Sequence, residues 1–136
     1  MPSAMADANY PEDLLYHPEH DWARFDADDP SLATFGITWF AQDALGEVVF
    51  FEPPEVGSSV TKDEPYAEVE SVKAVSDVYA PMSGEIVEVN TALGDTPDAI
   101  NTDPYGDGWF VKVRLSDAEA ERSQLLSQAD YVASLQ

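Results

Sequence analysis

Lys73 is one of three lysines in this chain of 136 residues, and it lies within the unbroken segment 66–79, YAEVESVKAVSDVY. Fourteen residues exceed a typical strand of about 5–6. The apolar positions change parity between Val69 and Val72, so we expect the chain to reverse within 71–74 and to place Lys73 at a hairpin tip. A lysine there is usually only a solvated group. The alternative is an attachment point whose amine forms an amide with a cofactor's carboxyl.

Both histidines occur in the run HPEHD, residues 17–21. Imidazoles with flanking carboxylates can hold a metal ion. Two ligands at positions i and i+3 converge on a helix, however, and Pro18 opposes a continuous helix here. We therefore predict no metal site, and we interpret His20 as a packing or cleft residue.

The loop 101–108 is rich in oxygen side chains and imitates part of a calcium-binding loop. Lys112 stands where such a loop needs a bidentate glutamate, so an ordinary turn is the better interpretation. No nucleophile elbow, phosphate-binding loop or dinucleotide fingerprint occurs, and the chain has no cysteine to act as a nucleophile or thiolate ligand. An enzyme with its own catalytic apparatus is therefore not expected.

The chain carries 27 acidic residues against six lysines and arginines, which gives a formal charge of −21. Six scattered basic residues cannot offset repulsion from nucleic acid or from an anionic membrane. Because 44% of the residues are hydrophobic, the chain should fold. The acids are spread along the whole sequence, which suits a halophilic protein in a high-salt cytoplasm; a merely acidic mesophilic protein is the alternative. No export signal or membrane span is expected, so we predict a cytoplasmic location.

The surrounding elements must position this hairpin on a single domain. Residues 1–15 are predicted to form a flexible acidic arm, and residues 16–136 one domain. Two similar segments, 46–57 and 84–94, flank the hairpin, and each opens with Gly-Glu and continues as a β-branched strand. They are either two related β units or a chance similarity.

Local signals predict antiparallel strands with short peripheral helices. Capping residues and turn residues set the expected boundaries. The expected elements are strands at 22–25 and 32–37, a helix from the cap Thr38 to Leu45 that ends at Gly46, a strand at 109–115, a helix to about residue 126 opened by a capping box of Ser116 and Glu119, and a short helix capped by Ser127.

The segment 69–81, VESVKAVSDVYAP, resembles the lipoyl-attachment segment of glycine cleavage system H proteins. Further similar segments follow in the same order over residues 16–135. They are HDW at 20–22, GIT at 36–38, AQDALG at 41–46, PEVG at 54–57, SGE with VEVN within 83–90, and 101–109. Gly57 lies sixteen positions before Lys73 and Gly84 eleven after it, which matches the spacing in that family.

The resemblance implies a barrel-sandwich hybrid fold of two antiparallel sheets and a non-catalytic carrier role. Lipoate attached to Lys73 would receive the aminomethyl group of glycine from a pyridoxal-phosphate glycine decarboxylase. An aminomethyltransferase would pass the one-carbon unit to tetrahydrofolate, and a flavin dihydrolipoyl dehydrogenase would reoxidise the arm. A lipoylating enzyme must also recognise the chain.

The resemblance also assigns the residues around the arm. The loaded arm would fold into a surface cleft, with Asp21 and Asp77 as carboxylates for its protonated amine. Asp21 stands where the family more often has Glu. Glu70 and Gly84 would help the lipoylating enzyme recognise the hairpin, and Gly57 would meet a turn requirement.

The departures from the family pattern are mild. Asp63 stands where Gly is common, and FEP at 51–53 replaces an apolar-Glu-Leu run. Biotin carriers share the fold but set their lysine between methionines, whereas Val72 and Ala74 flank Lys73 here, which favours lipoate. An unmodified binding module that keeps only the scaffold is a third interpretation.

Overall fold

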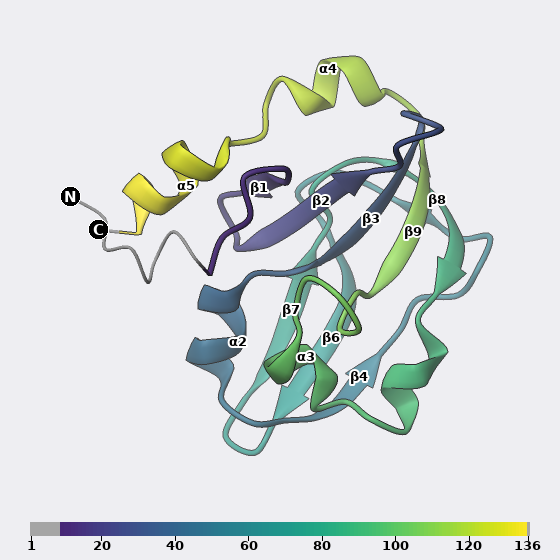
Figure 1. The fold of residues 1–136 in the computed structure, drawn as a ribbon. Coiled ribbons are helices and arrows are strands. Elements are labelled where there is room, and N and C mark those ends of the chain that lie inside the picture. The colour runs from purple at the N-terminus through teal and green to yellow at the C-terminus, as the bar shows by residue number, and fades with distance from the viewer. Residues whose placement is uncertain (1–8, 136) are drawn as a thin grey trace.

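The computed structural model describes residues 9–135 and contains two antiparallel sheets (Figure 1). The larger sheet has six strands in the order β1-β2-β3-β9-β8-β5, and the smaller has three in the order β4-β6-β7. The strands are β1 (Leu15–His17), β2 (Asp21–Phe25), β3 (Leu32–Ile37), β4 (Val48–Glu52), β5 (Ser59–Val60), β6 (Pro65–Ser71), β7 (Val75–Tyr79), β8 (Gly84–Val89) and β9 (Val111–Leu115). The mainly β prediction is confirmed.

Short helices surround the sheets, as the sequence predicted. They are α2 (Trp39–Leu45), the 3-10 helix η1 (Thr91–Gly94), α3 (Ala99–Thr102), α4 (Ala118–Arg122) and α5 (Gln128–Ser134). Figure 1 shows α4 and α5 along one side of the larger sheet and α2 beside the hairpin of β6 and β7. Among the described residues, no helix is long and apolar enough to cross a membrane.

The two sheets enclose one hydrophobic core, because alternate residues of each strand point towards the opposite sheet. Phe35, Ile86 and Val113 come from the larger sheet, and Phe51 and Val69 from the smaller; all five are almost completely buried in one cluster. Truncating a buried ring such as that of Phe51 to alanine typically costs about 3–5 kcal/mol. This core fixes the smaller sheet, which carries the predicted hairpin.

A second apolar cluster joins the N-terminal segment to α5. Tyr16 stacks on Tyr131 with ring centroids 4.7 Å apart, and both rings are completely buried. Trp22 lies in the same cluster, and a β-carbon at Gly36 would approach its ring to 2.5 Å. Only glycine therefore fits beside this tryptophan, and this close contact fixes the packing of β3 against β2.

Part of the segment predicted as an N-terminal arm, residues 1–15, packs against the body of the fold. Tyr10 and Leu14 are buried in the second cluster, so this part of the predicted arm is packed. Aromatic contacts of Tyr10 with Tyr16 and Tyr131 hold it there. Residues 1–8, the rest of that arm, lie outside the described residues.

Two predicted helix caps are confirmed. The Thr38 hydroxyl oxygen accepts the N–H of Ala41 at the start of α2, and Gly46 ends that helix with a φ of 81°. The Ser127 hydroxyl oxygen accepts the N–H of Asp130 at the start of α5. Both are side-chain caps that satisfy otherwise unpaired helix donors.

The capping box predicted after β9 is wrong. Asp117 is the N-cap of α4 and makes no side-chain cap bond, and the helix ends at Arg122 instead of near residue 126. The chain leaves the helix because Leu126 pairs with Tyr16 through two backbone hydrogen bonds of 2.7 and 2.8 Å. Glu121 bonds the N–H and hydroxyl of Ser83. Contacts with distant segments override the local signal.

The two similar segments place one strand in each sheet, β4 and β8. Their glycines are not equivalent. Gly46 and Gly57 have positive φ values of 81° and 92°, whereas Gly84 opens a strand and Gly94 ends η1 without a positive φ. The similarity is therefore limited to the strands.

Candidate functional site

Lys73 lies in the reversal between β6 and β7, where the parity of the sequence predicted it. Glu70 pairs with Val75 across the hairpin, and the Ser71 N–H donates to the Ala74 carbonyl at 2.8 Å. The Ser71 hydroxyl oxygen accepts the N–H groups of Lys73 at 3.3 Å and Ala74 at 3.1 Å. This serine closes a turn that contains no glycine, proline or asparagine.

The hairpin tip is braced by the segment that links α2 to β4. The Val72 N–H donates to the Glu47 carbonyl at 3.0 Å. A β-carbon at Gly46 would lie 3.3 Å from Cε of Lys73, so the lysine stem runs beside this glycine. Asn101 fixes the same segment: its amide donates to the Gly46 carbonyl, and its side-chain oxygen accepts the Val48 N–H.

A cavity of about 350 Å³ lies next to this hairpin. Residues 74–79, which directly follow Lys73, form one wall, and α2 forms another through Phe40 and Ala44. His20 and Asp21 contribute from the start of β2. An arm attached to Lys73 could therefore fold back between α2 and β7.

Asp21 is the buried carboxylate of this cavity. It is 1% exposed, and its Oδ2 atom has no hydrogen-bond partner among the described residues. Burial is the main reason that its pKa is raised well above the usual range, and the nearby charge of Glu19 raises it further. The buried hydroxyl of Tyr66 also has no partner in the described structure. An orphaned acceptor in a cavity fits a ligand with a protonated amine.

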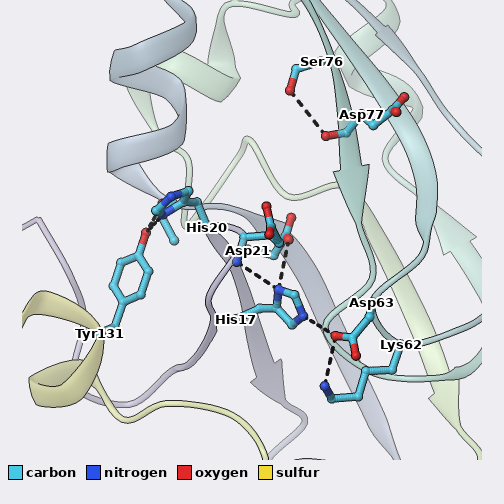
Figure 2. A network of polar contacts seen from close by, with 10 residues as sticks. His17, His20, Asp21, Lys62, Asp63, Ser76, Asp77 and Tyr131 are labelled. Atoms are coloured by element: carbon cyan, nitrogen blue, oxygen red, sulfur yellow. Dashed lines mark hydrogen bonds and ion pairs between the residues drawn. The ribbon is translucent and has the colours of Figure 1, made fainter. Parts of the chain in front are cut away.

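The two histidines contact different partners, so they do not converge on a common ligand (Figure 2). His20 Nδ1 lies 2.8 Å from the Tyr131 hydroxyl, and its ring packs on Phe40 in the cavity wall. Burial lowers the pKa of His20, which favours the neutral imidazole. His17 instead contacts Asp63 through Nε2 at 2.5 Å.

Asp77 lies at the edge of the cavity with an exposed side chain. It pairs across the hairpin with Glu68, and Figure 2 shows its side chain well apart from Asp21. The two predicted cleft carboxylates are therefore different: Asp21 is buried in the wall, and Asp77 stands at the rim. Glu70 is exposed on β6, three residues before Lys73.

The two predicted recognition and turn glycines lie away from the lysine in the fold. Gly57 has a φ of 92°, a conformation that suits glycine. Gly84 lies in the larger sheet between β5 and β9, and a β-carbon there would approach the Arg114 carbonyl oxygen to 2.2 Å. The structure therefore gives Gly84 a packing requirement and does not bring it to the hairpin tip.

Sequence reasoning missed three residues that shape the site. Ser71 could have been found, because serine side chains form turns by accepting nearby N–H groups. Asn101 gave no local signal, since its partners lie more than fifty residues away. His17 was considered only as a metal ligand, and its bond to Asp63 spans 46 residues.

A two-sheet β scaffold that presents one lysine at a hairpin tip beside a cavity defines a carrier protein with a covalently attached arm. The sequence model of the glycine cleavage H-protein family matches residues 14–136. The chain is 53% identical to the glycine cleavage system H protein of Rubrobacter xylanophilus over 129 residues, which cover 95% of this chain and 97% of that one. It is 53% identical to the H protein of Halorhodospira halophila over 121 residues, or 89% of this chain and 91% of the other.

The fold agrees with this similarity. The crystal structure of a glycine cleavage system H protein from Mycobacterium marinum aligns with a TM-score of 0.82 at 41% identity, covering 92% of this chain and 98% of that one. The chain belongs to the glycine cleavage H-protein family. It is a lipoyl-carrying shuttle of the glycine cleavage system, and the predicted barrel-sandwich fold is confirmed.

Proposed function

We propose that Lys73 carries the lipoyl group and that the chain moves an aminomethyl group between enzymes without catalysing a step itself. The position of Lys73 at the braced hairpin tip carries this proposal. The other two lysines are engaged in the body of the fold. Lys62 Nζ bonds Asp63 at 3.0 Å, and Lys112 lies on β9 over the ring of Trp109.

The cavity beside the hairpin would shelter the loaded arm. When bound, the lipoyl group supplies a disulfide that takes up the aminomethyl group and electrons. Asp21 would accept hydrogen bonds from the protonated amine, because its Oδ2 atom is buried without another partner. The aromatic wall formed by His20 and Phe40 would exclude water, and Asp77 would add negative charge at the rim.

The outer face of the smaller sheet supports a docking role for the hairpin. Two rows cross its three strands: Phe50, Glu70 and Val75 nearest the tip, and then Glu52, Glu68 and Asp77. All six side chains are exposed. A partner with an apolar patch bordered by basic side chains would fit these rows. Glu70 would contribute to recognition by the lipoylating enzyme, whereas Gly84 would act only through packing.

The proposed partners are the pyridoxal-phosphate glycine decarboxylase, the tetrahydrofolate-dependent aminomethyltransferase, dihydrolipoyl dehydrogenase and the lipoylating enzyme. All four must reach the same arm, so they would bind the hairpin in turn. The cytoplasmic location stays a prediction. We also propose that the carrier domain begins at or before Tyr10, within the segment predicted as the arm.

The test is aminomethyl transfer from glycine to tetrahydrofolate with the two enzymes and either wild-type chain or Lys73→Arg. We expect the variant to keep the fold, measured by circular dichroism, and to lose transfer. Lys62→Arg is the matched control and should retain transfer. An active Lys73→Arg variant would contradict the carrier mechanism.

A further inference from the structure

His17 is a buried imidazole whose two nitrogens have separate partners. The ring is 4% exposed. Nδ1 accepts the N–H of Glu19 at 3.0 Å, so in the neutral ring Nδ1 is unprotonated and Nε2 carries the proton. Nε2–H then donates to Oδ1 of Asp63 at 2.5 Å (Figure 2). Each nitrogen therefore ties a different segment to β1.

The first of these bonds holds the turn that delivers the cavity residues. The His20 N–H donates to the His17 carbonyl at 2.9 Å, and the His20 carbonyl accepts the Thr38 N–H. His20 has a φ of 73°, which a non-glycine residue adopts only when surrounding contacts impose it. Asp21 follows directly and pairs with His17 in the β1–β2 register. His17 therefore fixes the backbone from which Asp21 extends.

The second bond uses a residue in a strained conformation. Asp63 has a φ of 73° in the turn before β6, a position where the H-protein family commonly has glycine. An aspartate there costs backbone energy that glycine would not. Its carboxylate in turn bonds His17 and Lys62, and these hydrogen bonds, that of His17 foremost, lower its pKa. The aspartate therefore accepts a backbone conformation that glycine would adopt more easily, and in return it makes a specific contact with His17.

The His17 ring also lies close to the Asp21 carboxylate. Its Nδ1 lies 3.9 Å from Oδ2 of Asp21. Glu19 also faces Asp21 and raises its pKa, and Asp21 in turn raises the pKa of the phenols Tyr66 and Tyr131. His20, the residue before Asp21, forms a hydrogen bond with the Tyr131 hydroxyl. When His17 takes up a proton, the imidazolium lies between the carboxylates of Asp21 and Asp63.

We propose that His17, anchored by Asp63, is a positioning residue of the carrier cleft that sets both the orientation and the charge of Asp21. This inference rests on the proposed role of Asp21 as acceptor of the loaded amine. In the neutral ring the bond from the Glu19 N–H sets the orientation. With a proton on Nδ1 that bond is lost, and the cation 3.9 Å from Oδ2 favours the ionised form of Asp21. Asp63 supports both effects, because its carboxylate accepts the Nε2–H and holds the ring in place.

The test measures the half-life of the aminomethyl-loaded protein, from released formaldehyde, between pH 5 and pH 8. His17→Asn keeps an acceptor for the Glu19 N–H but loses the contact with Asp63. Asp63→Gly removes the anchor and relieves the strained φ, so this variant should fold at least as well as the wild type. Glu88→Gln, which removes an exposed ion pair with Lys112, is the matched control.

We expect both variants to shorten the half-life about fivefold near pH 7, the size of the loss of one ordinary hydrogen bond. We also expect the pH below which the wild type loses the group to move upward in both, because Asp21 protonates more easily without an imidazolium beside it. A purely structural role would shorten the half-life equally at every pH.

Asp21→Asn distinguishes the role of His17 from that of Asp21. If it shortens the half-life while His17→Asn and Asp63→Gly leave the half-life or its pH midpoint unchanged, the role of His17 is refuted and that of Asp21 stands. If Asp21→Asn has no effect, the cleft role of Asp21 fails, and the inference fails with it.

Discussion

The side chain of Lys73 runs directly beside Gly46, where a β-carbon would lie 3.3 Å from Cε and 3.8 Å from Nζ of the lysine. Gly46 also has a φ of 81° and ends α2. The helix end therefore both supports the hairpin tip and leaves room for the lysine stem. The position of the Lys73 stem therefore depends on the placement of both α2 and the hairpin.

Gly46→Ala should impair lipoylation and stability together. A φ of 81° with a ψ of −157° costs a non-glycine residue about 1–3 kcal/mol, and the added methyl would crowd the Lys73 stem. We expect a loss of unfolding free energy of that size and slower attachment of lipoate, followed by intact mass over time. Gly94→Ala, a glycine with open space around it, is the matched control. Equal lipoylation rates in the two variants would contradict the contact.

Ser71→Ala should loosen the turn that presents the lysine. The hydroxyl oxygen accepts two N–H groups, and one hydrogen bond contributes about 0.5–1.5 kcal/mol to stability. We expect a loss of about 1–2 kcal/mol in urea unfolding and faster hydrogen exchange at Lys73 and Ala74. Ser76→Ala on the adjacent strand should show neither change at the tip. Unchanged exchange in Ser71→Ala would show that strand pairing alone defines the reversal.

Asp21→Asn should make the protein more stable near neutral pH. Burial raises the pKa of Asp21, so the folded state binds its proton more tightly than the unfolded state. That favourable contribution is complete below the unfolded pKa and is lost as pH rises through the folded pKa. The wild type should therefore lose stability relative to Asp21→Asn as pH rises from 4 to 8.

Urea unfolding of both proteins across this pH range measures the difference. Asp77→Asn is the control, because it makes the same change at an exposed side chain. If wild type and Asp21→Asn have parallel profiles, Asp21 is not a strained buried acid. A stabilising substitution at Asp21 would be typical of a residue kept for function.

High salt should stabilise this chain. With 27 acidic and six basic residues, self-repulsion opposes the compact state, and salt shortens its range to about 3 Å at 1 M. We expect the thermal midpoint to rise by several degrees between 0.1 M and 3 M potassium chloride, since 1 kcal/mol shifts the midpoint by a few degrees. Equal midpoints would remove the high-salt explanation of the acidity.

Local signals explain what the sequence could predict. The parity change between Val69 and Val72 revealed the hairpin, and serine and threonine at positions 127 and 38 marked two helices that the structure contains. Each of these features depends on residues a few positions apart. The motif around Lys73 then identified the family.

The features that could not be predicted depend on contacts between distant segments. Nothing near Asp21 in the sequence shows that it is buried, because its surroundings come from β6, α2 and α5. The strained turn at Asp63 makes sense only with His17 opposite it. Leu126 likewise leaves the predicted helix to pair with Tyr16.

The central claim is that Lys73 holds the arm, and intact-mass measurement of the protein from cells that make lipoate tests it most directly. The wild type is predicted to show the mass increment of one lipoyl group, and Lys73→Arg to show the unmodified mass. A biotinyl increment or no increment in the wild type would contradict the account, as would a lipoyl increment that persists in Lys73→Arg.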